Sequence, residues 1–331
     1  MKALVTGAGG FVGQWLCRAL LRDGWSVTGT TLGFAPEPGV LTPAELMLMH
    51  WRSIDLRPGT DRRTPSALLQ REAPDVVFHL AGVSFVPAAA DDPIAALETN
   101  VGAAVRLIEA VREQREAGGP DAVLLVIGSA EQYGRHEASD LPLTERHECR
   151  PRTFYAATKA AQEHFALAAA RHDGLRIVAT RSFNHSGPGQ AKSFLLPALV
   201  ERARGATAAR AAAAAAGEGA PPGIAIGNTD TVRDFLHVAD VVEAYIALAA
   251  RGRPGEVYNV CSGEGATVGT IAAEVLARAG VDAPLVTDPS LQRPVDVPVL
   301  VGDNSKLRAD TGWAPRRTRA DIIADLLNAS S

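Results

Sequence analysis

The sequence predicts an α/β fold in which a doubly wound parallel sheet is covered by helices on both faces. Three observations lead to this prediction. Short β-branched-rich runs alternate with stretches of helical period, the runs are almost continuously apolar, and a glycine-rich turn joins the first run to the first helix. Strands that are buried on both faces have this continuous apolar character, so helices are needed on both sides of the sheet.

The expected strands follow one another through the first half of the chain and return once near its end. They cover residues 3–5, 26–30, 75–80, 122–127, 176–180 and 257–260, and a further strand is expected just before Asp55. Between them, apolar residues recur at three- and four-residue spacing. This spacing predicts helices over residues 11–22, 94–116, 154–171 and 238–250.

After about residue 183 the pattern becomes irregular. The alanine-rich stretch 206–216 favours a helix by propensity, and the glycines and prolines that follow predict a surface loop. The earlier pattern then resumes near residue 238. We therefore expect two interleaved domains, a larger one of residues 1–182 plus about 234–260 and a smaller one of about 183–233 plus 261–331.

Composition argues against several kinds of partner. The 331 residues carry a net charge of only −4 with both signs interspersed, which favours neither nucleic acid nor an anionic membrane. There is no charged leader and no run of ~20 apolar residues, so we expect neither secretion nor insertion into a membrane. The three cysteines are too scattered for a disulfide framework or a metal site. We expect a cytoplasmic protein that binds no metal.

Gly7, Gly10 and Gly13 mark the turn between the first strand and the first helix. The first two let the backbone turn tightly and approach a pyrophosphate, and the third lets helix and sheet pack closely. Free N–H groups and the positive end of the helix dipole then meet the phosphate charge. This context predicts a Rossmann-type dinucleotide site rather than a simple glycine-rich turn.

The end of the second strand bears on the choice of nicotinamide cofactor. An acidic residue there would bind the ribose 2′-hydroxyl and repel a 2′-phosphate, but the chain has Thr30, Thr31 and Leu32. The missing carboxylate favours NADP(H), whereas the lack of a neighbouring arginine leaves NAD(H) open. Asp55 and Leu56 are expected to border the adenine, and a simple turn carboxylate is the alternative for Asp55.

Tyr155 and Lys159 are four residues apart and therefore lie on one face of a helix. A lysine ammonium near a phenol favours the phenolate, so we expect a lowered pKa for Tyr155 and proton transfer near neutral pH. The same ammonium can bind ribose hydroxyls. With the glycine motif upstream and a strand ending near Ser129 between them, the pair is interpreted as catalytic rather than as a surface pair.

The glycine motif, HLAG at 79–82, Asn100, Ser129 and YAATK at 155–159 resemble the extended short-chain dehydrogenase/reductases over nearly the whole chain. The resemblance implies that Ser129 hydrogen-bonds the reacting oxygen, Tyr155 transfers the proton and Lys159 positions the cofactor ribose. It also implies cofactor contacts at Gly7, Gly10, Phe11, Val12, Gly13, Thr31, Asp55, Leu56, Leu80, Ala81, Gly82, Asn100, Tyr155 and Lys159.

The nucleotide-sugar branch of this family is indicated by FNHSGPGQ from residue 183, SF from 193, RDF from 233 and YNVCSG from 258. Arg233 and Arg293 would each offer a planar charged donor to a diphosphate or ribose, although such arginines more often form surface ion pairs. Asp296 would hold the nucleotide ribose. The resemblance implies substrate contacts at Ser84, Phe85, Asn184, Ser193, Phe194, Arg202, Arg233, Arg293 and Asp296.

Within this branch the chain is most similar to GDP-4-dehydro-6-deoxy-D-mannose reductases, which make GDP-D-rhamnose. The implied reaction transfers a hydride to the C4 ketone of a GDP-linked sugar, while Tyr155 protonates the alkoxide that Ser129 stabilises. GDP-mannose 4,6-dehydratases and 4-epimerases are the alternatives. Glu131 stands where a dehydratase has its base, and we count it among the catalytic residues. However, Ala130 replaces a hydroxyl of the dehydratase Thr-Ser-Glu run, and SGPGQ at 186–190 replaces an arginine-bearing segment.

Several other histidine and cysteine residues could carry out chemistry, but we expect structural roles for them. His79 ends an apolar strand and is expected to be a core histidine, and His185 is expected to line the sugar pocket without taking part in catalysis. No base is evident for a nucleophilic thiol at Cys17, Cys149 or Cys261.

Two further expectations concern the whole chain. The helices over 94–116 and 154–171 carry more alanine and leucine than one buried stripe needs, which together with the resemblance predicts a homodimer through a four-helix bundle. A function of another class is a non-catalytic NADP-binding sensor. The presence of Ser129, Tyr155 and Lys159 argues against it.

Overall fold

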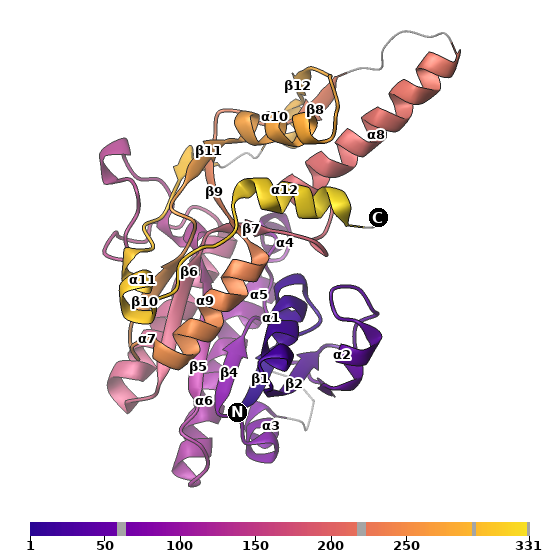
Figure 1. Ribbon diagram of the computed structural model, residues 1–331. Helices are drawn as coiled ribbons and strands as arrows, with labels where there is room; N and C mark the ends of the chain where they lie inside the picture. Colours follow the sequence, from indigo (N-terminus) through magenta and orange to yellow (C-terminus); the bar gives the residue numbers. More distant parts are fainter. Residues whose placement is uncertain (58–63, 217–222, 293–295, 330–331) are drawn as a thin grey trace.

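The computed structural model describes residues 1–57, 64–216, 223–292 and 296–329, and a seven-stranded sheet forms its centre (Figure 1). The strand order is β10-β6-β5-β4-β1-β2-β3, and every pairing is parallel. The bounds are β1 Lys2–Thr6, β2 Ser26–Thr31, β3 His50–Ser53, β4 Val76–His79, β5 Val123–Ser129, β6 Ile177–Ser182 and β10 Val257–Val260. The order reverses beside β1, where open sheets of this type bind their ligands. The predicted fold class is confirmed.

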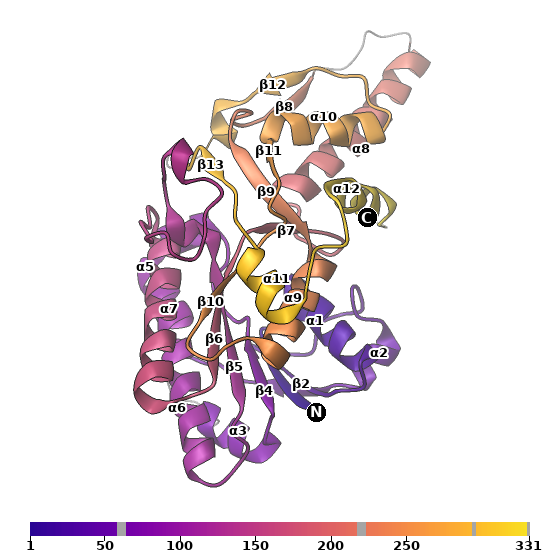
Figure 2. The same cartoon turned by 60° about the vertical axis from the view of Figure 1, so that its left-hand side comes forward.

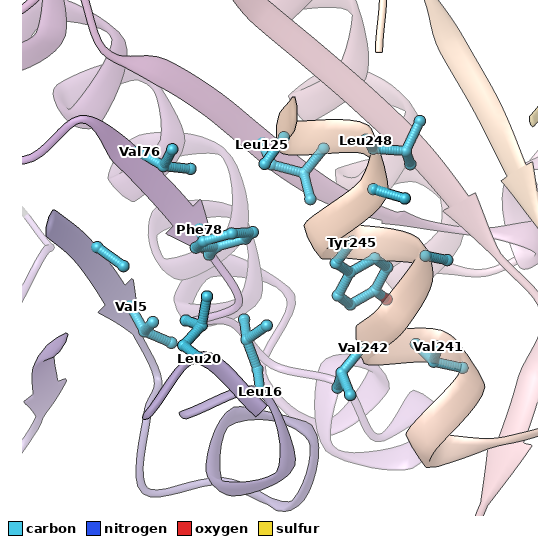
Figure 3. Packing of buried hydrophobic residues seen from close by; sticks show 14 of the residues in the cluster. Val5, Leu16, Leu20, Val76, Phe78, Leu125, Val241, Val242, Tyr245 and Leu248 are labelled. Carbon is cyan, nitrogen blue, oxygen red and sulfur yellow. The ribbon is translucent and has the colours of Figure 1, made fainter. Parts of the chain in front are cut away.

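Two layers of helices cover the sheet because successive strand residues face opposite sides. Val5 and Phe78 pack against α1 (Phe11–Arg22) and α9 (Val238–Arg251), whereas Leu4 and Val77 face α3 (Pro65–Glu72), α6 (Ala103–Glu116) and α7 (Phe154–Asp173). Figure 3 shows the first of these cores, with Leu16 and Leu20 of α1 and Tyr245 of α9 gathered around the sheet. Continuous apolar strands are what this double burial requires.

The helix predicted over 94–116 is present but not uniform. It begins as α5 (Pro93–Leu97), passes through a π-helical turn (Glu98–Gly102) and continues as α6. Asn100 lies in this turn and is fully buried, and its Nδ2 donates to Thr158 Oγ1 at 2.9 Å. Single π-helical turns often occur at functional sites, and this one places Asn100 against α7.

The rest of the chain forms a second region beyond the carboxyl ends of the large sheet (Figure 2). One sheet contains β7 Asn184–Ser186, β9 Val232–His237, β11 Gly265–Thr267 and β13 Val299–Leu300, and a second contains β8 Ile224–Ile226 and β12 Leu285–Thr287. A separate apolar core joins α8 (Leu195–Ala216), α10 (Val268–Arg278) and α12 (Arg319–Asn328). The expected domain boundary near residue 234 falls within β9, and the domain division stays a prediction.

The remaining elements are short. They are the helices α2 Pro43–Met47, α4 Val86–Asp91 and α11 Ser305–Thr311, and 3-10 turns at Ala130–Tyr133, Ala138–Asp140 and Pro289–Leu291. A helix over the alanine-rich stretch is confirmed as the second half of α8, which projects away from the large sheet (Figure 1). The loop predicted after it falls largely on residues 217–222, outside the described residues. Within the described ranges, no helix has both the length and the apolar character needed to span a membrane.

Candidate active site

A pocket of about 550 Å³ lies at the carboxyl ends of β1, β4 and β5, between the large sheet and the second region. The walls come from the glycine turn, the segment after β4, the end of β5, α7 and the segment after β6. Predicted residues that line this pocket are Gly7, Gly10, Phe11, Val12, Gly13, Leu80, Ala81, Gly82, Ser84, Phe85, Ser129, Glu131, Tyr155, Lys159, Asn184 and Phe194.

The glycine turn forms a cradle that larger residues would fill. Gly7 has a φ of 68°, and a Cβ there would lie 2.8 Å from the nitrogen of Ala81. A Cβ at Gly13 would lie only 2.2 Å from the Gly7 carbonyl oxygen. Among the residues that the structure describes, no side chain caps the start of α1, so its first N–H groups are not taken by a side-chain acceptor. These residues fit the pyrophosphate of a dinucleotide.

Ser129 and Tyr155 reach the pocket from neighbouring elements. Ser129 is the last residue of β5; its Oγ accepts from the Glu131 N–H at 3.2 Å, and its own N–H donates to Gln132 Oε1 at 2.9 Å. Tyr155 lies in the first turn of α7, which Thr153 caps by accepting from the Ala156 N–H. A hydrogen bond joins the Tyr155 phenol to Ser129.

Lys159 lies one helical turn after Tyr155 and is almost fully buried. Its Nζ donates to the Ile127 carbonyl oxygen and to Gln162 Oε1, both at 2.9 Å. Burial lowers the pKa of Lys159 to about 8, because the charged form is poorly solvated there.

The expected lowering of the Tyr155 pKa is wrong. Burial raises this pKa to about 12, and the negative charge of Glu131 adds to the increase, while the hydrogen bond with Ser129 opposes it. Lys159 does not offset the burial, since its ammonium is directed to Ile127 and Gln162. Tyr155 therefore holds its proton at neutral pH and is a proton donor in this state.

Part of the pocket wall is aromatic. Phe85 and Phe194 meet edge to face with ring centroids 5.8 Å apart, and His185 stacks on Phe11 at 6.3 Å. Burial lowers the pKa of His185, so this ring is a neutral surface of the pocket. Asn184 Oδ1 is buried and, within the described part of the chain, has no hydrogen-bond partner. A ligand hydroxyl is the kind of donor that this oxygen lacks.

Several predicted cofactor contacts lie outside the pocket wall. The Val83 N–H donates to Oδ1 of Asn100 at 2.8 Å, and the Asn100 amide donates back to the Val83 carbonyl oxygen. Asn100 therefore stabilises the loop after β4. Thr31 donates to the Gly33 carbonyl oxygen at 2.8 Å. Asp55 forms an ion pair with Arg57 at 2.7 Å, and this arginine holds the pKa of Asp55 below its usual value. Leu56 is buried in the core.

The predicted substrate contacts of the second region are also dispersed. Arg233 is buried, forms an ion pair with Asp296 and donates to the Val297 carbonyl oxygen at 2.8 Å. Arg202 donates to the Ala225 carbonyl oxygen, away from the pocket, and Ser193 is exposed. Arg293 lies outside the described residues.

Sequence reasoning missed pocket residues contributed by distant elements. Ser182 at the end of β6 and Tyr245 of α9 line the pocket and are hydrogen-bonded to each other at 2.8 Å. Ile127 and Leu300 also line it. Ile127, Tyr245 and Leu300 belong to apolar runs that resemble core positions, so no local signal could have identified them. Ser182 directly precedes the FNHSGPGQ segment, which is the signal that could have indicated it.

Other titratable groups have no catalytic arrangement. His79 is fully buried, its Nδ1 is hydrogen-bonded to Thr6 Oγ1, and burial lowers its pKa to about 3. Burial raises the pKa of Cys17 and of Cys261. Over the ranges that the structure describes, no three His, Cys, Asp or Glu side chains are grouped to hold a metal ion.

Known proteins resemble this chain over almost its full length. A sequence model of the family described as GDP-mannose 4,6 dehydratase matches residues 4–326. GDP-6-deoxy-D-mannose reductase from Pseudomonas aeruginosa is 32% identical over 329 residues, covering 99% of this chain and 96% of the relative. UDP-glucose 4-epimerase from Streptomyces lividans is 30% identical over 338 residues, covering 98% and 94%.

Solved structures share the architecture. RMD from Pseudomonas aeruginosa, complexed with NADPH, has a TM-score of 0.75 and 30% identity, covering 99% of this chain and 98% of that one. MoeE5 in complex with UDP-glucuronic acid and NAD has a TM-score of 0.79 and 26% identity, covering 98% and 97%. The chain therefore belongs to the GDP-mannose 4,6 dehydratase family of nucleotide-sugar oxidoreductases, within the extended short-chain dehydrogenase/reductases.

Proposed function

We propose that this enzyme reduces the C4 ketone of GDP-4-dehydro-6-deoxy-D-mannose with NADPH, giving GDP-D-rhamnose. One observation carries the proposal: a protonated phenol, Tyr155, is hydrogen-bonded to Ser129 in the same pocket as the glycine turn. The similarity to GDP-6-deoxy-D-mannose reductase supports the choice of substrate.

Each residue of the site has a defined task in this reaction. The reduced nicotinamide, when bound, supplies the hydride. Ser129 donates a hydrogen bond to the ketone oxygen and stabilises the charge that develops on it, and Tyr155 gives that oxygen its proton. An alkoxide is a much stronger base than a phenolate, so this transfer is favourable even from a phenol with a pKa of about 12. Lys159 offers its remaining N–H to the cofactor ribose.

NADP(H) is the proposed cofactor and NAD(H) the alternative. The end of β2 has no carboxylate to repel a 2′-phosphate, and Thr31 presents a hydroxyl there. RMD is complexed with NADPH, which supports NADP(H), and MoeE5 is complexed with NAD.

The proposed substrate contacts use both regions of the molecule. Asn184, Phe85 and Phe194 are proposed to contact the sugar, because they line the same pocket as Tyr155. Arg233 and Asp296 are proposed to bind the nucleotide end, which would require their ion pair to rearrange. A GDP-linked sugar is favoured by the similarity to the reductase.

The test supplies the purified chain with NADPH and GDP-4-dehydro-6-deoxy-D-mannose. Reduced-nicotinamide absorbance should fall, and one molecule of GDP-D-rhamnose should form for each NADPH consumed. The matched reaction contains GDP-mannose and no reductant. Conversion of GDP-mannose in that reaction would contradict the reductase proposal and support a dehydratase.

A 4,6-dehydratase is the second candidate because Glu131 lines the same pocket as Tyr155. A dehydratase needs a carboxylate to remove the C5 proton, whereas a reductase does not. Glu131→Gln should therefore leave ketone reduction within a fewfold of the parent rate. A loss of ~10²-fold or more would show that the carboxylate takes part in the reduction, which would contradict the proposed mechanism.

Exposed apolar side chains on two neighbouring helices bear on the oligomeric state of the protein. Ile94, Leu97, Phe154 and Phe165 lie on α5 and α7 and are each more than half exposed. We propose that a second copy covers them, forming a homodimer through a four-helix bundle.

The three free cysteines support a cytoplasmic setting, where thiols stay reduced.

A further inference from the structure

Two protein acceptors fix the direction of the Lys159 ammonium. Of its three N–H donors, one is given to the carbonyl oxygen of Ile127 on β5 and one to Oε1 of Gln162 on α7. Because the ammonium nitrogen is tetrahedral and bonded to Cε, two occupied N–H directions leave a single direction for the third. Lys159 lines the pocket, so this donor is the one available there.

Gln162 is an unusual residue for its surroundings. Its side chain is fully buried, and its Nε2 has no hydrogen-bond partner among the residues that the structure describes. An unsatisfied buried N–H group costs ~1–3 kcal/mol. Methionine has a similar length and would avoid this cost. In the described part of the chain, the hydrogen bond that the amide oxygen accepts from Lys159 is the interaction that offsets this cost.

We propose that Gln162 is a positioning residue whose amide oxygen holds the Lys159 ammonium so that the remaining N–H points at the cofactor ribose. This inference rests on the proposed cofactor site. It assigns no chemical step to Gln162, which acts through Lys159. An apolar residue at this position would leave the ammonium with Ile127 as its one protein acceptor.

The titratable groups around Lys159 do not change their charge in the pH range in which Lys159 titrates. His79 of β4 is neutral at physiological pH, because burial and, to a smaller extent, the charge of Lys159 lower its pKa to about 3. Tyr155 is protonated at the same pH. Glu163 of α7 forms a buried ion pair with Arg181 of β6. Glu131 lies on the pocket wall and adds a negative charge near Tyr155. Between pH 6 and 10, a change in cofactor affinity that follows a single titration is therefore assigned to Lys159, whose pKa is about 8.

The experiment measures NADPH binding by calorimetry from pH 6 to 10 for the full chain and three variants. Affinity of the parent should fall as the pH rises through about 8. Gln162→Met removes an acceptor of the charged form and should move this midpoint down by about one pH unit. Gln162→Glu adds a negative charge beside the ammonium and should move it up by about one pH unit.

The matched control is Gln114→Met. Gln114 is also buried, lies on α6 and donates to the carbonyl oxygens of Pro74 and Pro120, away from the pocket. This variant should lose thermal stability without moving the midpoint. A purely structural role for Gln162 would make its two variants behave in the same way.

Shifts in opposite directions for the two Gln162 variants would support the proposal. It would be overturned if both variants kept the parent midpoint, or if both moved it in one direction together with a loss of thermal stability. If the parent bound neither NADPH nor NADH at any pH, the proposed cofactor site would fail as well, which separates the two conclusions.

Discussion

At pH 7 the phenol of Tyr155 carries its proton, because burial raises its pKa to about 12 and the charge of Glu131 acts in the same direction. Such a group delivers a proton readily to an alkoxide. It accepts one poorly from an alcohol, since its phenolate form is scarce. This protonation state therefore suits Tyr155 to the proton donation that the proposed ketone reduction needs.

Tyr155→Phe tests this role directly. The variant keeps the buried ring but loses the proton, so kcat for ketone reduction should fall by about 10²- to 10⁴-fold while NADPH affinity and thermal stability are retained. Tyr258→Phe is the control, because its hydroxyl donates to Asp310 of α11 and neither residue lines the pocket. A sensor without catalysis would instead show no turnover in the parent and unchanged cofactor binding in both variants.

The sequence predicted those site residues that carry a local signature. The glycine turn and the Tyr155 and Lys159 pair are defined by short spacing within one element, so their positions could be read without the fold. Gln162 and Tyr245 carry no such signature, because their importance comes from contacts with other side chains. The direction of the Tyr155 pKa shift was mispredicted for the same reason, since burial depends on residues distant in sequence.

Two helical glycines differ in the space around them that a side chain could occupy. Gly13 opens α1 with no room for a Cβ, whereas a Cβ at Gly205 of α8 would have nothing within 4 Å. Gly13→Ala should therefore force α1 away from the glycine turn, lowering both thermal stability and NADPH affinity. Gly205→Ala should raise the free energy of unfolding by about 0.5–1 kcal/mol through helix propensity. Chemical denaturation and cofactor titration of both variants check this, and a stable Gly13→Ala protein with parental affinity would contradict it.

The Glu163 and Arg181 ion pair links α7 to β6 beneath the site. Both side chains are buried, their closest contact is 2.7 Å, and Gln132 donates to Glu163 at 2.8 Å. Glu163→Gln should cost about 3–5 kcal/mol, because it leaves the Arg181 charge buried without its partner. Glu148→Gln removes the exposed pair with Arg150 and should cost at most about 1 kcal/mol. Equal midpoints of urea unfolding for the two variants would refute the distinction.

The elements themselves were largely predictable. The helix over 11–22 and the strand over 257–260 agree with the structure at both ends, because buried strands and amphipathic helices follow simple periods. The π-helical turn was not predicted. It is stabilised by contacts of Asn100 with Val83 and Thr158, which the local pattern does not contain.

For the whole molecule, the exposed apolar residues of α5 and α7 give a test of assembly. Phe165→Asp places a charge on the proposed dimer face and should convert the protein to a monomer at micromolar concentration, as measured by sedimentation. Phe34→Asp is the control, because Phe34 is also exposed, more so than Phe165, but lies after β2 and not on α5 or α7. A parent protein that is monomeric under the same conditions would exclude the proposed homodimer.

Two of the crossings between the large sheet and the second region are very short. β9 ends at His237, and α9 begins at Val238, so a strand of one sheet runs straight into a helix that packs on the other. His237 caps this junction, accepting from the Ala239 N–H at 3.0 Å and contacting Asp325 of α12 at 3.1 Å. β6 and β7 are separated by Phe183 alone. These two short junctions tie the strands of the second region closely to the large sheet, so we expect ligand entry to involve local movements of surface segments more than a large rotation of one region against the other.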